Sequence, residues 1–275
     1  METMPNSFHF ISGLPRAGST LLSALLRQNP RFSAGMTSPV GAIFNAMLGA
    51  TSQRNEGAVF IDDGQRRRLL RACFDAYYAE TGAAVVFDTN RQWTTKLPAL
   101  TALFPDARMI CCVRNPAWIV DSIESLVKRN AFELSGIFGF EPGGTVYSRA
   151  DGLSKPDGMV GFAWNALREA IYGPHADRLL LVRYEQLTAN PRGTLAAIYD
   201  FIGEELFPHD PDHIEPCYDM VEFDVRLGTP GLHEVGRAVH ARTRPTVLPP
   251  DLFNRFAGDA FWEDPKNLPT TVHIV

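Results

Sequence analysis

The chain has 275 residues, of which 45% are hydrophobic and 21% are charged, a length and composition suited to one α/β domain with a large buried core. Its net charge of -5 argues against a general binder of nucleic acids or of anionic membranes, so any anion site must be a local concentration of arginine and lysine. No stretch approaches eighteen uninterrupted apolar residues, and the first seven residues do not have the pattern of a secretion signal.

The cysteines match neither a zinc pattern nor a disulfide framework, and two of them are adjacent in an apolar run. We therefore expect reduced thiols and a cytoplasmic protein without nucleic-acid or membrane partners. The four cysteines are Cys73, Cys111, Cys112 and Cys217.

The first predicted element is a strand from Phe8 to Ser12, and a glycine-bracketed loop connects it to a helix from about Ser19 to Gln28. The loop has the sequence G-L-P-R-A-G-S-T and runs from Gly13 to Thr20; we call residues 13–20 the anion loop. Its spacing is that of a P-loop, which places backbone N–H groups and a helix N-terminus around a phosphate. The lysine of nucleotide triphosphatases is absent, because Ser19 occupies its position and the cation is Arg16, inside the loop.

A tight glycine turn without a ligand is the alternative interpretation of this loop. Two features favour an anion: holding Arg16 in a narrow turn is costly unless it meets one, and Ser19 and Thr20 add hydroxyl donors at the helix N-terminus. The missing lysine, and the lack of a clear strand ending in a metal-binding aspartate, disfavour an ATP or GTP hydrolase that uses Mg²⁺. An arginine suits a transferred group that carries less charge than phosphoryl, such as a sulfuryl group.

Short apolar runs continue to alternate with helical segments, which predicts a parallel sheet wrapped by helices. The later predicted elements are a helix from Asp62 to about Tyr78, strands over residues 84–87, 108–113 and 179–182, and a helix from Pro191 to Ile202 closed by Gly203. Because ligands bind at the carboxyl ends of parallel strands, we expect residues 13–20, 88–91 and 114–122 to face one cleft.

No internal repeat or linker divides the chain, so we expect a single domain over residues 1–275. Residues 132–157 are rich in glycine and contain two prolines; we predict that they form a lid over the acceptor and call them the lid segment. Residues 228–275 are rich in proline, and we expect them to be irregular and to pack across the sheet.

A second anion site is indicated by Arg114, at the end of its strand, and Ser122, about two turns into the following helix. Arginine can hold a phosphate as a bidentate fork, and serine can add a hydroxyl donor. The alternative is that Arg114 pairs with a carboxylate such as Asp121 and that Ser122 is an ordinary helix residue.

Four segments, taken in order, resemble those of the PAPS-dependent sulfotransferases, most closely the tyrosylprotein-sulfotransferase-like branch. They are residues 13–21, Leu103-Phe104-Pro105, Val113-Arg114-Asn115 with Ser122, and the stretch from Val182 to Gly203. The resemblance implies the α/β sulfotransferase fold, with a P-loop-like parallel sheet flanked by helices. It also implies 3′-phosphoadenosine-5′-phosphosulfate (PAPS) as co-substrate, no catalytic metal, and in-line sulfuryl transfer to a hydroxyl or amine of a small-molecule or peptide acceptor.

The same resemblance implies roles for individual residues. Arg16 would stabilise charge on the sulfuryl oxygens and on the departing 5′-phosphate. The residues implied at the 5′-phosphosulfate are Pro15, Arg16, Ala17, Gly18, Ser19 and Thr20, and those at the 3′-phosphate are Arg114 and Ser122.

On the acceptor side the sequence departs from that branch, since its catalytic glutamate corresponds to Thr37 and its catalytic lysine to Thr89. Asp88, at a strand end, is the first candidate base, because a partly desolvated carboxylate titrates closer to neutral pH. Its alternative role is a structural carboxylate that pairs with Arg91 or caps the following turn. His233, in a loop with glycines and a proline, is the second candidate, and its alternative is an ordinary solvated or hydrogen-bonded histidine.

Two more residues are candidates for the donor site. Arg91 could supply the missing cation, and Trp93 could stack on the adenine, although a core aromatic is the simpler interpretation of Trp93. We therefore expect a PAPS-dependent sulfotransferase with Arg16, Asp88 and His233 as catalytic candidates. Two other functions stay open: a P-loop small-molecule kinase, and a relative that binds PAPS or its product 3′-phosphoadenosine 5′-phosphate (PAP) without catalysis.

Overall fold

A computed structural model describes residues 7–216, 220–241 and 243–275 of the chain. Over these residues, six strands form one sheet in the order β2-β3-β1-β4-β5-β6, and all neighbouring strands are parallel. The strands are β1 (Ser7–Gly13), β2 (Phe32–Ala34), β3 (Val85–Thr89), β4 (Met109–Val113), β5 (Leu179–Arg183) and β6 (His273–Ile274). The predicted α/β fold with a parallel sheet is confirmed.

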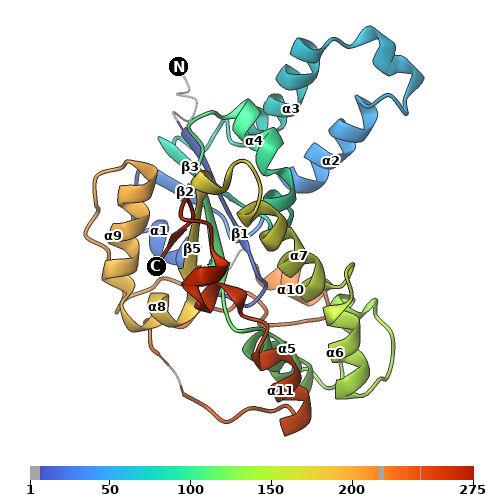
Figure 1. The fold of residues 1–275 in the computed structure, drawn as a ribbon, viewed down its shortest axis with the longest axis vertical. Helices are drawn as coiled ribbons and strands as arrows, with labels where there is room; N and C mark the ends of the chain where they lie inside the picture. The colour runs from blue at the N-terminus through green and yellow to red at the C-terminus, as the bar shows by residue number, and fades with distance from the viewer. Residues whose placement is uncertain (1–6, 217–219, 242) are drawn as a thin grey trace.

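Helices cover both faces of the sheet (Figure 1). They are α1 (Ser19–Leu26), α2 (Val40–Ala50), α3 (Asp63–Tyr77), α4 (Leu97–Leu103), α5 (Pro116–Arg129), α6 (Val146–Ser154), α7 (Met159–Ile171), α8 (Tyr184–Ala189), α9 (Pro191–Ile202), α10 (Val221–Arg226) and α11 (Pro250–Ala257). In Figure 1, α1, α8 and α9 lie on one side of the strands and α3, α4 and α7 on the other, so the domain has three layers.

Local sequence explains where the helices next to the cleft begin and end. Strand β4 is apolar and buried along its whole length, and Asn115 stops it by capping α5, its side chain accepting a hydrogen bond from the Ala117 N–H at 3.1 Å. Pro116 occupies the first helical position, and Lys128 and Arg129 lie in the last turn, where they complement the helix dipole.

Aromatic side chains fill the layer between the sheet and α3. Phe10 of β1 packs against Phe74 of α3 and Trp93, with ring centroids 5.7 Å apart in both pairs. On the other face, Phe32 stacks on Tyr199 of α9 at 5.3 Å. Helices therefore pack on both faces of the sheet through large apolar side chains, and this packing holds the strand ends that carry the site in position.

The C-terminal segment is less irregular than expected. Residues 228–275 contain α11 and the short strand β6, and α11 packs on α5 through Trp118 and Phe253, whose ring centroids lie 5.1 Å apart. The lid segment likewise contains α6 and the 3₁₀ turn Gly136–Phe138. Its helical content comes from local caps, such as Thr145, whose hydroxyl accepts from the Ser148 N–H at 3.2 Å.

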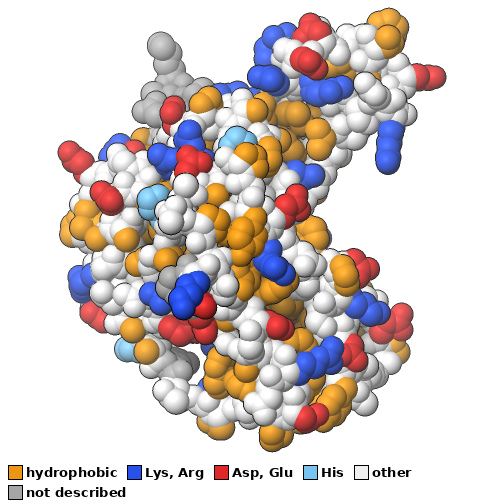
Figure 2. Space-filling view, viewed as in Figure 1, with side chains coloured by type: hydrophobic (Ala, Val, Ile, Leu, Met, Phe, Trp, Pro, Cys, Tyr) orange, Lys and Arg blue, Asp and Glu red, His pale blue; other side chains and the backbone are white. Residues whose placement is uncertain are grey.

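Figure 2 shows a hollow between the projecting α2–α3 pair and the part of the molecule that carries α6. No helix among the described residues is both long and apolar enough to span a bilayer. Cys73, Cys111 and Cys112 are buried free thiols, as their positions in apolar segments predict, while Cys217 lies outside the described residues.

Candidate functional site

A cleft of about 1650 Å³ opens at the carboxyl ends of the central strands. The three segments predicted to share it all contribute residues: the anion loop after β1, residues 89–91 of the predicted segment 88–91 at the end of β3, and Arg114 with Ser122 after β4. Residues 231–236, 238–241 and 243–245 line it as well. Strand β1 lies between β3 and β4, and this central position brings the three segments together.

The anion loop depends on glycine at both ends. Gly13 has a φ of 97°, and a Cβ there would overlap the Cys112 carbonyl of the neighbouring strand. Gly18 has a φ of 98° and precedes α1, and no described side chain caps that helix. The first-turn N–H groups of α1 therefore stay available for an anion, with Ser19 and Thr20 lining the cleft beside them.

Arg16 is held in an uncommon backbone conformation, and its half-buried side chain lines the cleft. Its φ is 56°, in the left-handed region that non-glycine residues rarely adopt. Its Nε donates to Ser122 Oγ at 3.1 Å, and its NH1 donates to the Leu232 carbonyl. Burial, aided by Arg114 and Arg129, lowers the pKa of Arg16 to about 10, so this side chain remains a cation at neutral pH.

Arg114 lies beside the anion loop and has donor capacity to spare. Its NH1 donates to the Arg16 carbonyl at 3.3 Å, and its guanidinium lies 4.1 Å from the centre of the Tyr184 ring. Its Nε is buried and has no hydrogen-bond partner among the described residues. Pairing with Asp121 does not occur, because that carboxylate is bonded to Arg244, Thr246 and the Val247 N–H.

Asp88 is not placed in the cleft, which corrects the expectation that it faces the ligand. Its side chain is 0% exposed and accepts hydrogen bonds from Ser38 and Tyr78 on one oxygen, at 2.6 and 2.7 Å, and from Trp93 Nε1 on the other, at 2.7 Å. Burial raises the pKa of Asp88, and these three donors oppose that rise. The geometry favours the alternative role of Asp88 as a structural carboxylate, but the expected partner Arg91 is not among the residues that bond to it.

Trp93 is also outside the cleft. It is 0% exposed and packs among the aromatic residues between the sheet and α3, so stacking on adenine is ruled out in this conformation and the simpler core interpretation holds. Arg91, two residues earlier, does line the cleft, and its side chain is exposed there. The Ala17 side chain is buried, so only the main chain of this residue could contribute to anion binding.

His233 lines the cleft and is bonded to a carboxylate that the sequence had not singled out. Its Nδ1 lies 2.6 Å from Asp224 Oδ1, and its main-chain N–H donates to Asp224 Oδ2 at 2.8 Å. Burial lowers the pKa of His233 below its usual value, although Asp224 opposes the shift. The ring is thus available as a neutral base near pH 7.

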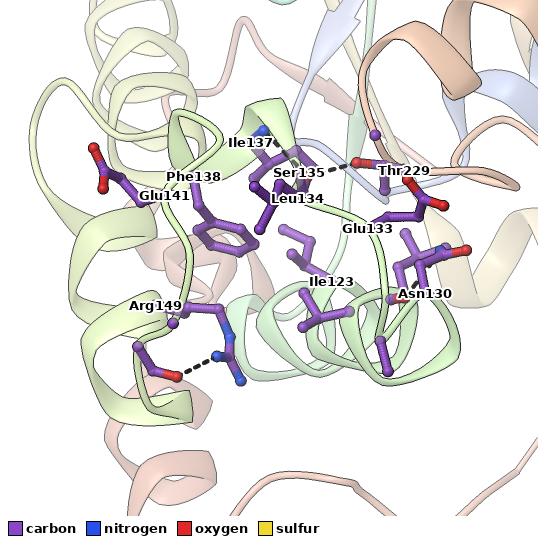
Figure 3. A pocket seen from close by; sticks show the side chains of 16 residues that line it. Ile123, Asn130, Glu133, Leu134, Ser135, Ile137, Phe138, Glu141, Arg149 and Thr229 are labelled. Atoms are coloured by element: carbon purple, nitrogen blue, oxygen red, sulfur yellow. Dashed lines mark hydrogen bonds between the residues drawn. The ribbon is translucent and has the colours of Figure 1, made fainter.

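The lid segment is attached to the loop that leads to His233. The Gly136 N–H donates to the Leu227 carbonyl at 2.7 Å, and the hydroxyls of Ser135 and Thr229 lie 2.5 Å apart. Figure 3 shows this second contact beside a smaller cavity of about 220 Å³, into which Phe138 projects. The lid segment therefore helps to hold the loop that carries the candidate base.

Sequence reasoning had missed Asp224 and Tyr184 as parts of the site. Asp224 lies nine residues before His233, a spacing that no helix or strand period would connect, so no sequence signal marked the pair. Tyr184 directly follows β5, and its place at a strand end could have identified it. Among the described side chains, no three histidine, cysteine, aspartate or glutamate residues cluster as metal ligands.

Comparisons with known proteins agree with this geometry. A family model described as "Sulfotransferase family" matches residues 9–208. Protein-tyrosine sulfotransferase 2 of Gallus gallus is 28% identical over 205 residues, and protein-tyrosine sulfotransferase 1 of Danio rerio is 27% identical over 203. Each alignment covers 70% of this chain but only 50% and 52% of the relatives, so the chain spans about half the length of the curated relatives it matches.

A solved structure shows the same fold. The sulfotransferase domain from the curacin biosynthetic pathway superimposes with a TM-score of 0.50 at 16% identity, covering 74% of this chain and 76% of that one. The family match extends over the anion loop, Arg114, Ser122 and all of β5. The chain belongs to the sulfotransferase family.

Proposed function

We propose that the protein transfers a sulfuryl group from PAPS to a hydroxyl or amine acceptor. One observation carries this proposal: Arg16, Arg114 and Ser122 converge at the anion loop, although they come from two different strand ends. Two guanidinium groups in contact with one loop repel each other unless anions are bound between them. The buried, unpartnered Nε of Arg114 is a donor that a phosphate oxygen would satisfy.

The residues fit a donor with an anion at each end. The main chain of residues 15–18, the α1 N-terminus and the Ser19 and Thr20 hydroxyls would hold the 5′-phosphosulfate, and Arg114 with Ser122 would hold the 3′-phosphate. Arg91 also lines the cleft, after β3 on the other side of β1 from β4 and Arg114, and would add positive charge near the sulfuryl oxygens. When bound, the donor supplies a sulfuryl group joined to phosphate through an oxygen that leaves readily.

Arg16 would act on the charge that develops during transfer. Its Nε and NH1 donate to Ser122 and to the Leu232 carbonyl, and these bonds hold the guanidinium in place while its remaining N–H donors can bond the donor's oxygens. A preorganised donor to a developing oxyanion is typically worth ~3–4 kcal/mol of barrier. Burial in the cleft strengthens this interaction, because little water remains to screen it.

His233 would be the general base. Its Nε2 takes the proton of the acceptor hydroxyl or amine, the acceptor atom forms the new bond to sulfur, and the sulfur–oxygen bond to the 5′-phosphate breaks with its electron pair going to that phosphate. The products are the sulfated acceptor and PAP. No residue of this scheme requires a metal ion, and we propose that transfer is metal-independent.

The acceptor we propose is a small molecule or a peptide. Two of the matched relatives are named protein-tyrosine sulfotransferases, which supports a phenolic hydroxyl. Threonines at positions 37 and 89, both lining the cleft, cannot act as base or cation, which favours an acceptor chemistry that depends on His233. The buried free thiols are compatible with the cytoplasmic location we propose.

Transfer of ³⁵S from labelled PAPS tests this function directly. The acceptors are 4-nitrophenol, tyramine, hexanol and a tyrosine peptide, each assayed with and without EDTA. We expect labelled product in EDTA, a fall of about 10²–10³-fold in kcat for Arg16→Ala and about 10²–10⁴-fold for His233→Ala. Arg67→Ala, a remote exposed arginine on α3, is the matched control. Phosphoryl transfer from ATP–Mg²⁺ to these acceptors, with no transfer from PAPS, would identify a kinase instead.

A further inference from the structure

Asp224 is bonded twice to a single residue, His233. Its carboxylate is 4% exposed on α10, with Oδ1 bonded to the ring and Oδ2 to the main-chain N–H. The chain between the two residues is closed by further main-chain bonds, from the Thr229 N–H to the Asp224 carbonyl at 2.9 Å and from the Leu232 N–H to the Thr229 carbonyl at 3.2 Å. Both the position and the orientation of the imidazole are therefore constrained.

These contacts determine which ring nitrogen carries hydrogen. An ionised carboxylate can only accept, so the short contact to Oδ1 requires the hydrogen on Nδ1. In the neutral ring, Nε2 then has a free lone pair. No described residue forms a hydrogen bond with Nε2, and His233 lines the cleft together with Arg16 and Arg91.

We propose that Asp224 is a positioning residue of the active site, which holds Nδ1–H of His233 and so keeps Nε2 unprotonated and turned toward the acceptor. The inference rests on the proposed function, in which His233 takes the acceptor's proton. After that step the imidazolium has hydrogen on both nitrogens, and the charge is balanced by Asp224 at 2.6 Å. Asp224 itself neither gains nor loses a proton.

The charges around the ring support this role. His233 faces Asp224 from α10, Arg16 from the anion loop and Arg91 from the segment after β3, and the Phe223 ring packs edge-on at 5.7 Å. Burial and the two arginines lower the pKa of His233, whereas Asp224 raises it. Without Asp224 the His233 ring would be a weaker base, because it would face two cations with no compensating carboxylate, and its orientation would no longer be fixed.

Asp224→Asn tests the hydrogen bonding of the carboxylate without changing the size of the side chain. Asp224 satisfies two donors, the ring Nδ1–H and the His233 N–H, and an asparagine offers one oxygen for both. When that oxygen accepts from the main chain, the amide NH₂ faces Nδ1 and selects the tautomer with hydrogen on Nε2. Glu222→Gln is the matched control, because Glu222 lies exposed on the same helix and pairs with Arg226.

The test is long-range ¹H–¹⁵N NMR of the ring nitrogens in the full-length protein, with a pH titration. We expect hydrogen on Nδ1 in the wild type and in Glu222→Gln. In Asp224→Asn we expect a gain of the Nε2–H tautomer and a lower pKa for His233. A wild-type spectrum with hydrogen on Nε2 would overturn the proposal. This measurement on the wild-type protein does not depend on the folding of a variant or on knowledge of the acceptor.

Kinetics with the best acceptor from the ³⁵S assay add the functional arm. We expect Asp224→Asn to lower kcat by about 10²-fold, with the acid limb of the pH–rate profile moved to lower pH and with the Kd for PAP unchanged. Wild-type kcat in Asp224→Asn, beside an inactive His233→Ala, would overturn the role of Asp224 alone. A fully active His233→Ala would instead refute the base assignment in the proposed function.

Discussion

Replacing Asp88 tests whether this carboxylate is a structural group or a catalytic one. Asp88→Ala removes the acceptor for three donors, the hydroxyls of Ser38 and Tyr78 and the indole N–H of Trp93. Ser38 is only half-buried and can turn to water, but Tyr78 and Trp93 are buried and lose the carboxylate that accepts their hydrogen bonds. An unsatisfied buried donor costs about 1–3 kcal/mol, so two of them predict a loss of about 2–6 kcal/mol in the free energy of unfolding.

Asp88→Asn should be much milder. The amide oxygen can accept from Trp93, and the amide NH₂ can donate to the Tyr78 and Ser38 oxygens, since a hydroxyl also accepts. We expect a loss of about 1–2 kcal/mol, because bonds to a charged acceptor are replaced by neutral ones.

Urea unfolding followed by circular dichroism measures both losses, and sulfuryl transfer measures the activity that remains. The structural account predicts that folded Asp88→Asn retains wild-type kcat within about threefold, against the 10²-fold or larger loss expected for a general base. Two results would refute the reasoning: an Asp88→Ala protein within about 1 kcal/mol of the wild type, or a stable Asp88→Asn protein that binds PAP but has lost catalysis.

Three other changes have defined outcomes. Burial lowers the pKa of His9 to about 4, so the unfolded chain binds the proton before the folded protein does as the pH falls. The free energy of unfolding therefore has its full value above pH 6.5 and declines toward pH 4. We expect this decline to be about 3 kcal/mol larger than in His9→Asn, whose side-chain oxygen still accepts from the Arg108 N–H. Equal urea midpoint shifts in the two proteins would contradict this. Arg114→Lys should weaken PAP about tenfold in calorimetry, with 5′-AMP unaffected, because the planar fork is lost; an equal loss for both ligands would show that Arg114 does not bind the 3′-phosphate. In Gly228→Ala, a Cβ on a residue with a φ of 64° would overlap the Leu134 carbonyl and displace the loop that carries His233. We expect kcat to fall about tenfold or more while PAP still binds. An unchanged kcat would show that the contact between the lid segment and this loop does not position His233.

The central fold could be predicted because its signals are local. Strands such as Met109–Val113 are continuous apolar runs bounded by polar residues, and Pro116 and Gly203 mark helix ends through their backbone preferences. The strands Phe32–Ala34 and His273–Ile274 were not predicted, because two or three residues are too few to show a pattern. They form at the edges of the sheet, where strands that are already folded supply the partners.

The geometry of the anion loop and the position of Arg114 could be predicted from sequence for the same reason. The anion loop derives its geometry from its own glycines, and Arg114 lies directly at a strand end. The surroundings of Asp88 depend instead on Ser38, Tyr78 and Trp93, which lie in three separate segments, so burial could not be read from the strand-end position. The partner of His233 was hidden as well, because only the folded loop brings Asp224 to both its ring and its main chain.

Isothermal titration with PAP and with ATP–Mg²⁺ tests the central claim most directly. In the proposed function the cleft binds a nucleotide with anions at its 3′ and 5′ ends, held by Arg114 and by the anion loop. The proposed function predicts that PAP binds at least about 100-fold tighter than ATP–Mg²⁺, a difference of about 2.7 kcal/mol. Binding of ATP–Mg²⁺ at equal or greater affinity, or no binding of PAP, would contradict it.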